Sequence, residues 1–482
     1  MPNNSLQSFA EQFVSSTRRY LFIRPEDGVL ILRPNKVHHL NPTAAAMLHA
    51  LYSAETVDVP AVVAHIAAQY NVEPARVEAD LESLLRSLSV LLSNQPGCAP
   101  AVKQTPFGTH KRLYPVLAEI ALTYRCQNRC TFCYASAPDR GRKVPAMSTA
   151  EVKAVMDKIV DQAHVPSLSF TGGEPTVRRD LPELVAHGRS RGLWMNLITN
   201  GIRCARPDLV QALAQAGLDS AQVSLEAGDA PTHDLVVGRV GAFQRSVQGI
   251  RNLRQAGIRV HTNTTINRNN RSALHGLIDL VAELGSEHLS MNMVIRTGDA
   301  VGQTDIGYAD IGPLVLDLKK HAEDKGLKFI WYSPVPFCLF NPAAYGLGSP
   351  SCSAADGLLS IAPDGGVLPC SSFEQGVGNL LREDFQAVWN RRSAKYWREK
   401  EFLPPGCRAC EYAELCCGAC PLYWDEQKTF AEIADHLQPA SPWADAVWRV
   451  KRRVFGQVKG VGVKKQEAGC KRQEAGRMTF DA

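Results

Sequence analysis

Long apolar runs are absent from the 482-residue sequence. No uninterrupted stretch approaches the roughly 20 apolar residues that a membrane-spanning helix needs. The first residues, Met1 to Phe13, are polar and lack the charged and then apolar pattern of a secretory signal. We therefore expect a cytoplasmic protein with no membrane partner.

A strong excess of one charge is also absent. The chain has 53 Lys and Arg against 48 Asp and Glu, and the formal charge of +5 is not gathered into one basic block outside the extreme C-terminus. This balance does not favour nucleic acid as a partner. Apolar residues make up 45% and charged residues 21%, as in ordinary globular proteins, and the length predicts about three domains.

Residues 15–95 are expected to form a small α+β domain. Strands are predicted at 20–23, 29–32 and 37–40, and apolar residues at helical spacing predict helices over 44–51, 59–70 and 77–92. Residues 96–112 are rich in proline, glycine and polar residues, so we interpret them as a linker.

Residues 113–310 alternate between strand and helix patterns. Strands are predicted at 116–124, 167–171, 193–199, 220–226, 258–266 and 288–295, with a helix between each pair, and Ser148 and Glu151 form a capping box before the first helix. Parallel strands need crossovers of this length, so the pattern indicates an α/β fold, a parallel sheet curved into a partial (β/α)6 barrel. Sites on such sheets lie at the C-terminal ends of the strands.

Beyond residue 330 the periodicity weakens while cysteine becomes frequent. We interpret residues 311–445 as a domain organised by metal more than by apolar burial. Residues 446–482 are interpreted as a basic, disordered tail, because its later part is charged and repeats Gln-Glu-Ala-Gly.

Cysteine is plentiful, and its spacing carries most of the functional information. A reducing compartment disfavours disulfides, so the 14 cysteines are expected to be metal ligands or unpaired thiols. Cys126, Cys130 and Cys133 are close enough in sequence for one loop to wrap one metal centre. Three thiolates leave one site of a four-metal cluster open, as substrate chemistry requires. The alternative is a zinc loop completed by a distant histidine.

The triad, with Phe132 before its last cysteine, resembles the signature of the radical SAM superfamily. The resemblance implies a [4Fe–4S] cluster whose open iron binds S-adenosylmethionine (SAM). One electron from the cluster then cleaves SAM and releases a 5′-deoxyadenosyl radical that takes hydrogen from the substrate. A flavodoxin- or ferredoxin-like protein is the expected electron donor.

The same resemblance implies SAM contacts at successive strand ends. After the second strand, Gly172 and Gly173 let the backbone approach a ligand, and Glu174 suits the methionine ammonium of SAM. At the fourth strand, Ser224 and Glu226 would meet the carboxylate or ribose, and Arg239 would clamp the carboxylate. The full set of expected SAM-binding residues is Gly172, Gly173, Glu174, Pro175, Asn200, Ser224, Glu226 and Arg239.

Seven later cysteines resemble the auxiliary-cluster extension called SPASM, which usually carries two [4Fe–4S] clusters. The resemblance assigns Cys338, Cys352, Cys370 and Cys420 to the first, and Cys407, Cys410 and Cys416 to the second. The usual final cysteine is missing, so Cys417, Asp435 or His436 would complete the second cluster, or it stays open. Cys338 is the least secure ligand, because its spacing from Cys352 is loose. A pair of structural zinc sites is the alternative.

The remaining cysteines have no such spacing. Cys98, Cys204, Cys417 and Cys470 are expected by default to be unpaired thiols, and a lone cysteine such as Cys204 is usually a small buried apolar residue.

The segments 28–43 and 72–81 resemble PqqD-like domains, winged-helix-like folds that grip the leader of a ribosomally made peptide. Such a leader would add a strand to an exposed edge near Lys36 to Leu40 and pack against the last helix. The alternative is a winged helix that binds DNA or pads the barrel, but its helices carry few Lys or Arg residues.

Together these features predict a radical SAM oxidoreductase that matures, through oxidative crosslinking, a ribosomally synthesised precursor peptide. One alternative is an enzyme that modifies a folded protein side chain or makes a cofactor. Another is an iron–sulfur electron carrier or regulator. No catalytic acid or base is identified from the sequence.

Overall fold

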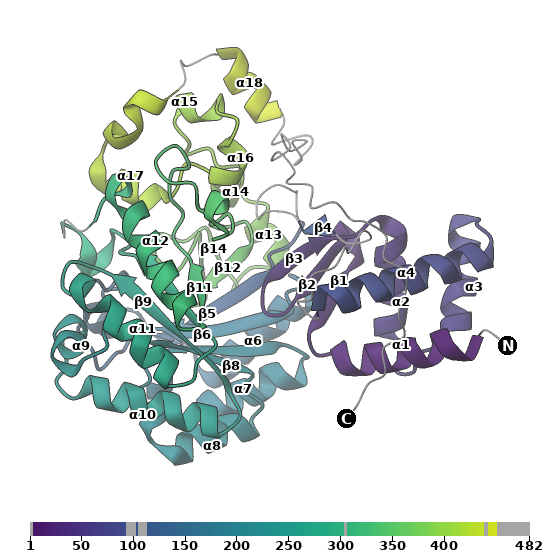
Figure 1. Cartoon of the computed structure of the whole chain (residues 1–482), viewed down its shortest axis with the longest axis horizontal. Helices are drawn as coiled ribbons and strands as arrows, with labels where there is room; N and C mark the ends of the chain where they lie inside the picture. The colour runs from purple at the N-terminus through teal and green to yellow at the C-terminus, as the bar shows by residue number, and fades with distance from the viewer. Residues whose placement is uncertain (1–2, 93–102, 105–112, 303–305, 438–441, 451–482) are drawn as a thin grey trace.

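The computed structural model describes residues 3–92, 103–104, 113–302, 306–437 and 442–450 (Figure 1). Most of the predicted linker and the tail from residue 451, with Cys98 and Cys470, lie outside these residues. Within them, no helix has the length and apolarity to cross a membrane.

The N-terminal unit combines four helices with a small antiparallel sheet. The predicted strands and helices are present, and the helix α1 was not predicted. Residues 3–13 looked polar, yet Leu6, Ala10, Phe13 and Val14 recur on one face of α1 and are buried among the other helices. The elements are α1 (Asn3–Thr17), β1 (Leu21–Arg24), β2 (Val29–Leu32), β3 (Lys36–His39), α2 (Pro42–Ser53), α3 (Val59–Tyr70), α4 (Pro74–Leu92) and β4 (Lys103–Gln104).

The third strand is not a free edge, which corrects the expectation of an exposed edge there. The sheet order is β1-β2-β3-β4, and β4 pairs antiparallel with β3 through His38↔Gln104 and His39↔Lys103. A two-residue strand gives no periodicity from which to predict it.

A ten-stranded sheet forms the middle of the molecule. Its order is β11-β10-β9-β8-β7-β6-β5-β12-β13-β14, and the strands from β5 to β11 are parallel. The six predicted strands are β5 (Leu117–Thr123), β6 (Ser167–Gly172), β7 (Trp194–Thr199), β8 (Ser220–Ser224), β9 (Arg259–Ile266) and β10 (His288–Met293). These confirm the α/β partial barrel.

Four further strands lie in the cysteine-rich part of the chain, where the sequence pattern was weak. β12 (Leu358–Ile361) pairs parallel with β5, so the C-terminal region extends the barrel sheet directly. The others are β11 (Lys328–Trp331), β13 (Gly366–Leu368) and β14 (Gly378–Asn379).

Helices cover the outer face of the parallel strands (Figure 1). The capping box before α6 is present: the Ser148 hydroxyl accepts the Glu151 N–H, and the Glu151 carboxylate accepts the Ser148 N–H at 2.8 Å. The principal helices are α6 (Thr149–Asp161), α7 (Leu181–Ser190), α8 (Pro207–Gln215), α9 (Ala230–Val237), α10 (Ala242–Gln255), α11 (Leu274–Glu283) and α12 (Tyr308–Asp324).

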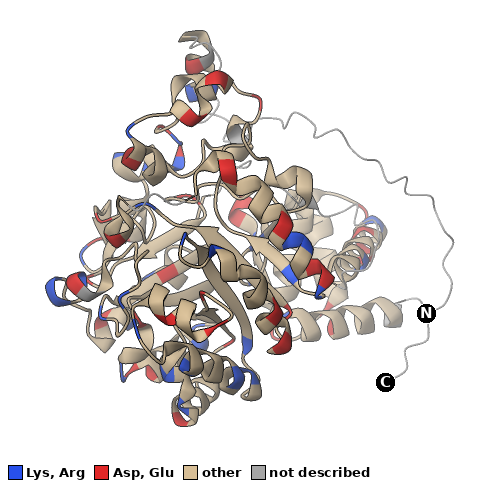
Figure 2. Cartoon of the chain, turned by 60° about the vertical axis from the view of Figure 1, so that its left-hand side comes forward, with Lys and Arg blue, Asp and Glu red and all other residues tan. Residues whose placement is uncertain are grey.

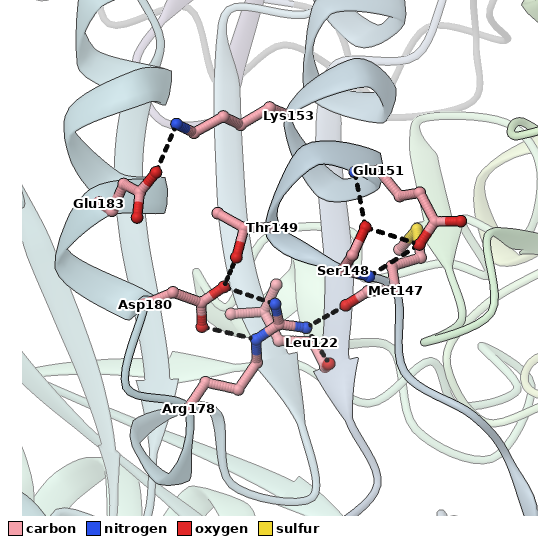
Figure 3. A network of polar contacts seen from close by, with 9 residues as sticks. All are labelled: Leu122, Met147, Ser148, Thr149, Glu151, Lys153, Arg178, Asp180 and Glu183. Atoms are coloured by element: carbon pink, nitrogen blue, oxygen red, sulfur yellow. Dashed lines mark hydrogen bonds and ion pairs between the residues drawn. The ribbon is translucent and has the colours of Figure 1, made fainter.

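Arg178 fixes the segment that follows β6 (Figure 3). Its guanidinium donates to the carbonyl oxygens of Leu122 and Met147 at 3.2 and 2.7 Å, and to both carboxylate oxygens of Asp180. A planar, multidentate guanidinium holds its partners in one geometry. Arg178 therefore ties the end of β6 to the end of β5.

The N-terminal unit rests on the barrel at the N-terminal ends of the strands. The fully buried Arg24 donates to the carbonyl oxygen of Pro115 at 2.7 Å, and Arg33 donates to that of Gly192 at 3.1 Å. Arg19 forms an ion pair with the buried Asp219, just before β8. The C-terminal ends of the parallel strands lie at the opposite end of the barrel.

The C-terminal region is built from short elements. The helix α18 includes residues 446–450, the first part of the predicted tail, because Trp448 is buried against Leu403 and Ala413. Charged residues of both signs are interspersed along the helices of the chain (Figure 2). The helical elements here are α13 (Phe385–Trp389), α14 (Arg392–Arg398), α15 (Pro405–Arg408), α16 (Ala413–Cys416), α17 (Pro421–Gln427), η7 (Ala431–His436) and α18 (Pro442–Val450).

Candidate functional site

The first cysteine loop starts directly after β5, at the C-terminal edge of the parallel strands. Its backbone pairs with the end of α9: Arg129 N–H donates to the Val237 carbonyl at 3.0 Å, and Thr131 N–H donates to that of Val236 at 3.1 Å. Arg239 Nη1 donates to the Gln127 carbonyl at 2.9 Å. Arg239 therefore supports the loop in this structure, and its contact with a SAM carboxylate stays a prediction.

The two glycines after β6 bring this backbone against the start of the cysteine loop. A Cβ on Gly172, whose φ is +132°, would lie 2.2 Å from the Thr123 carbonyl oxygen. A Cβ on Gly173 would lie 2.6 Å from the carbonyl oxygens of Tyr124 and Arg125. The glycines are thus required by backbone packing around the loop.

Glu174 is enclosed and braces two strand ends. It is fully buried, and its carboxylate accepts the Thr176 N–H at 3.0 Å, the Thr199 hydroxyl at 2.7 Å and the Asn200 N–H at 2.8 Å. Pro175 begins the short helix η2 (Pro175–Val177) that follows. The predicted contact of Glu174 with a SAM ammonium stays a prediction, beside this structural role.

Asn200, at the end of β7, contacts the cysteine loop directly. Its side-chain oxygen accepts from Gln127 Nε2 at 3.0 Å, and its side-chain nitrogen lies 3.9 Å from Cys126 Sγ. Asn200, which follows β7, is therefore in contact with the first cysteine of the loop.

Ser224 and Glu226 lie at the end of β8. Ser224 is the last residue of β8 and pairs with Asn263 of β9. Glu226 is buried and accepts the Thr265 N–H at 2.9 Å, and burial raises its pKa to about 8. Burial also raises the pKa of the Cys130 thiol well above its usual range.

The three thiols share one electrostatic environment. Burial raises the pKa of Cys126 to about 12, and the charges of Cys126 and Cys133 add to the raised pKa of Cys130. Backbone N–H groups of Asn128 and Ala137 donate to the sulfurs of Cys126 and Cys133, each at 3.4 Å. A positive metal centre stabilises buried thiolates, and such N–H groups are typical partners of cluster sulfurs.

Within the described part of the chain, no three His, Cys, Asp or Glu side chains are grouped so as to hold one metal ion. A [4Fe–4S] cluster binds each thiolate through a different iron atom, so its thiols stand further apart than those around a single ion. The three-thiol donor set and its N–H donors fit such a cluster.

The later cysteines fall into two groups. Burial raises the pKa of Cys370, and the nearby charges of Cys352 and Cys420 raise it further. Burial raises the pKa of Cys407 to about 12, and the charges of Cys338 and Cys410 contribute to this rise. Cys416 Sγ accepts the N–H of Phe337, the neighbour of Cys338, at 3.4 Å, which places Cys416 beside the second group.

The other candidate ligands and thiols are also placed by the structure. Asp435 and His436 are exposed on η7. Cys417 is fully buried next to Cys416, and Cys204 is fully buried in the apolar core of the barrel, as a small apolar residue would be.

A polar cluster that the sequence pattern did not predict lies between the first cysteine loop and the later one. Glu119 of β5 is 9% exposed and accepts a hydrogen bond from the Ser360 hydroxyl. Burial raises its pKa, against hydrogen bonds from Ser360 and Ser371. Tyr134 also shares a hydrogen bond with Ser371. The available signal was a glutamate inside an apolar strand and the polar residues directly after Cys133 and Cys370.

Three family models match the chain. They are Coenzyme PQQ synthesis protein D (PqqD) over residues 28–89, the Radical SAM superfamily over 120–281, and the iron–sulfur cluster-binding domain SPASM over 352–411. The chain is an enzyme with a radical SAM domain. Its three domains follow the predicted order, and its cofactors are [4Fe–4S] clusters and SAM.

Individual relatives of this radical SAM enzyme are distant. The AdoMet-dependent heme synthase of Methanosarcina barkeri is 26% identical over 341 residues, covering 67% of this chain and 95% of that protein. Streptococcus suis SuiB bound to the precursor peptide SuiA has a TM-score of 0.64 and 16% identity, over 85% of this chain and 96% of that one. SuiB bound to S-adenosylmethionine has a TM-score of 0.62 and 18% identity, over the same shares. The structural matches show a shared fold.

Proposed function

We propose that this radical SAM enzyme matures a ribosomally synthesised peptide, most simply by oxidative crosslinking. The observation that carries the proposal is the presence, in one chain, of the loop of Cys126, Cys130 and Cys133 and a PqqD-like unit. The solved structure of SuiB with its precursor peptide, on a similar fold, supports it.

The chain's own residues prepare the SAM site. Cys126, Cys130 and Cys133 would hold a cluster that, when bound, supplies the electron for cleavage of SAM. Gly172 and Gly173 keep the loop against β6, while Glu174 holds the end of β7 in place. Holding the loop in one geometry favours a productive arrangement of the ligand.

Glu119 is the residue that we propose for proton transfer. An oxidised product requires the substrate radical to lose one electron and one proton. Glu119 lines one small cavity with Tyr134 and Ser371, the residues directly after Cys133 and Cys370. Burial raises its pKa, which makes it a stronger base than an exposed glutamate. The electron would pass to the auxiliary clusters and then to an external carrier.

Leader binding by the N-terminal unit involves β3. Strand addition uses main-chain groups of a sheet edge, and β4 already pairs with His38 and His39. We propose that a leader replaces β4 on this edge and packs against α4. A two-residue pairing is a weak competitor for a longer peptide strand.

The proposal is tested with the full-length chain, reconstituted and kept without oxygen. Short open reading frames beside the gene supply candidate precursor peptides. Reduced enzyme, SAM and peptide should give 5′-deoxyadenosine and a peptide lighter by two hydrogen atoms per crosslink. If SAM were cleaved while none of the neighbouring peptides changed in mass, a peptide substrate would be contradicted.

A second candidate is chemistry on a small cofactor, which the similarity to a heme synthase favours. That match leaves a third of this chain uncovered. Chemistry on a small cofactor also gives no reason for the PqqD-like unit. Supplying a tetrapyrrole in place of the peptide separates the two functions. An electron carrier would release no 5′-deoxyadenosine in either experiment.

A further inference from the structure

The second auxiliary cluster lacks a thiolate if cysteines are assigned by sequence order alone. Cys407, Cys410 and Cys416 give three ligands, and no cysteine follows Cys420 before Cys470. A cluster fully held by protein needs four. The missing ligand must therefore come from elsewhere in the chain, if protein supplies it.

The turn that carries Cys338 is anchored beside this group. Leu339 and Phe340 N–H both donate to the Pro336 carbonyl at 3.0 Å, which closes a tight turn around Cys338. Phe337 N–H donates to Cys416 Sγ at 3.4 Å. The residue directly before Cys338 thus bonds to the sulfur of a second-cluster cysteine.

Side chains around the turn enclose the same group. The rings of Phe337 and Tyr412 have centroids 6.3 Å apart, and Tyr412 N–H donates to Cys410 Sγ at 3.4 Å. Cys407 and Cys410 pack against a small apolar cluster that contains Trp448. Cys416 Sγ also lies 3.9 Å from the Val335 carbonyl oxygen, so the segment directly before Cys338 contacts this cysteine at two points.

The alternative ligands lie differently. Asp435 and His436 are exposed, and Glu432 of the same short helix η7 accepts the Tyr308 N–H of α12 at 3.0 Å. Cys352 is on another segment, whose Ala355 N–H bonds to the Pro369 carbonyl at 2.8 Å, next to Cys370.

We infer that Cys338 is the fourth thiolate of the second auxiliary cluster, with Cys407, Cys410 and Cys416. This differs from the family pattern, which places Cys338 in the first cluster. The first cluster then keeps Cys352, Cys370 and Cys420, with one position for Cys417 or a bound molecule. The inference depends on the SPASM clusters and not on the identity of the substrate.

Iron and sulfide content of two reference variants test this assignment. Cys352→Ala/Cys370→Ala removes the first cluster, and Cys407→Ala/Cys410→Ala removes the second, so each should fall from about twelve irons per chain to about eight. In the first variant, adding Cys338→Ala should change the electron paramagnetic resonance signal of the remaining auxiliary cluster, because one of its irons loses a thiolate. In the second variant, the same addition should leave the signal of the remaining auxiliary cluster unchanged.

The opposite pattern would overturn the inference, because it would place Cys338 in the first cluster. A changed signal in both backgrounds, or in neither, would also overturn it, as would a parent protein with only two clusters. Cys470→Ala is the matched control, and it should keep the parent's iron content. Cys338 is exposed, so its removal leaves the apolar core intact, which circular dichroism checks.

Discussion

The carboxylate of Glu174 accepts the backbone N–H of Asn200 at 2.8 Å, and this bond joins the ends of β6 and β7. Asn200 in turn lies against the first cysteine of the loop, with its side-chain nitrogen 3.9 Å from Cys126 Sγ. The buried carboxylate of Glu174, which accepts hydrogen bonds from three residues, is thus connected to the proposed cluster through Asn200.

Replacing Glu174 by alanine should damage both stability and SAM binding. Each buried donor left without a partner costs about 1–3 kcal/mol. We expect the free energy of unfolding to fall by at least about 2 kcal/mol, and SAM affinity to fall about tenfold. Equilibrium binding of SAM and urea unfolding measure the two effects.

The control for Glu174→Ala is Glu183→Ala. Glu183 is 59% exposed and contacts only Lys153 in Figure 3, so an exposed ion pair worth about 1 kcal/mol or less is lost. Equal losses in both variants would argue against the bracing role of Glu174.

Gly173→Ala should disturb the cysteine loop. The added Cβ would lie 2.6 Å from two carbonyl oxygens, so the backbone of Tyr124 and Arg125 must move. A displacement of this kind can cost roughly 100-fold in rate. We expect 5′-deoxyadenosine formation to fall by about that factor. Gly276→Ala on the exposed face of α11 meets no atom within 4 Å and should keep the parent's rate.

The strands β5 to β10 could be predicted, because buried parallel strands appear as apolar runs between helical segments. The short strands β12 and β13 could not, since three or four residues among cysteines and prolines give no clear period. Spacing selected the cysteines as candidate ligands, but the grouping that we propose for them depends on the turn at Cys338. Glu119 was missed because only the fold brings Ser360 and Ser371 to it.

Stability should depend on pH through His233. Burial lowers its pKa to about 4, and its ring Nδ1 accepts the Glu226 N–H at 3.1 Å. Between about pH 6.5 and 4 the unfolded chain binds a proton that the folded chain does not, so the free energy of unfolding falls as pH drops through this window. The loss is up to about 3 kcal/mol.

His233→Asn keeps an acceptor for Glu226 and cannot take the proton, so its unfolding free energy should change less between about pH 7 and 5. His65→Gln, on the exposed face of α3, is the control and should follow the parent. Urea unfolding at several pH values is the measurement. Identical slopes for His233→Asn and the parent would contradict the buried neutral histidine.

Glu119→Gln should separate radical formation from product formation. The amide keeps the size of the side chain but is not a base, so loss of proton transfer should slow peptide modification about 100-fold. Formation of 5′-deoxyadenosine should stay within about twofold, since Glu119 is not among the residues that hold the SAM loop. Mass spectrometry of both products measures the ratio, and Glu287→Gln, which is 88% exposed, is the control. Parallel losses of the two products would contradict the role.

Removal of β4 should strengthen leader binding if a leader uses the edge of β3. Proline has no backbone N–H, so Lys103→Pro/Gln104→Pro cannot keep the pairing with His38 and His39. Losing a competitor worth about 1 kcal/mol should tighten the dissociation constant about fivefold. Fluorescence anisotropy of a labelled precursor peptide with the full chain measures it. Thr105→Pro, next to the strand, keeps both paired residues and should bind as the parent does; equal affinity of all three proteins would mean that the leader binds elsewhere.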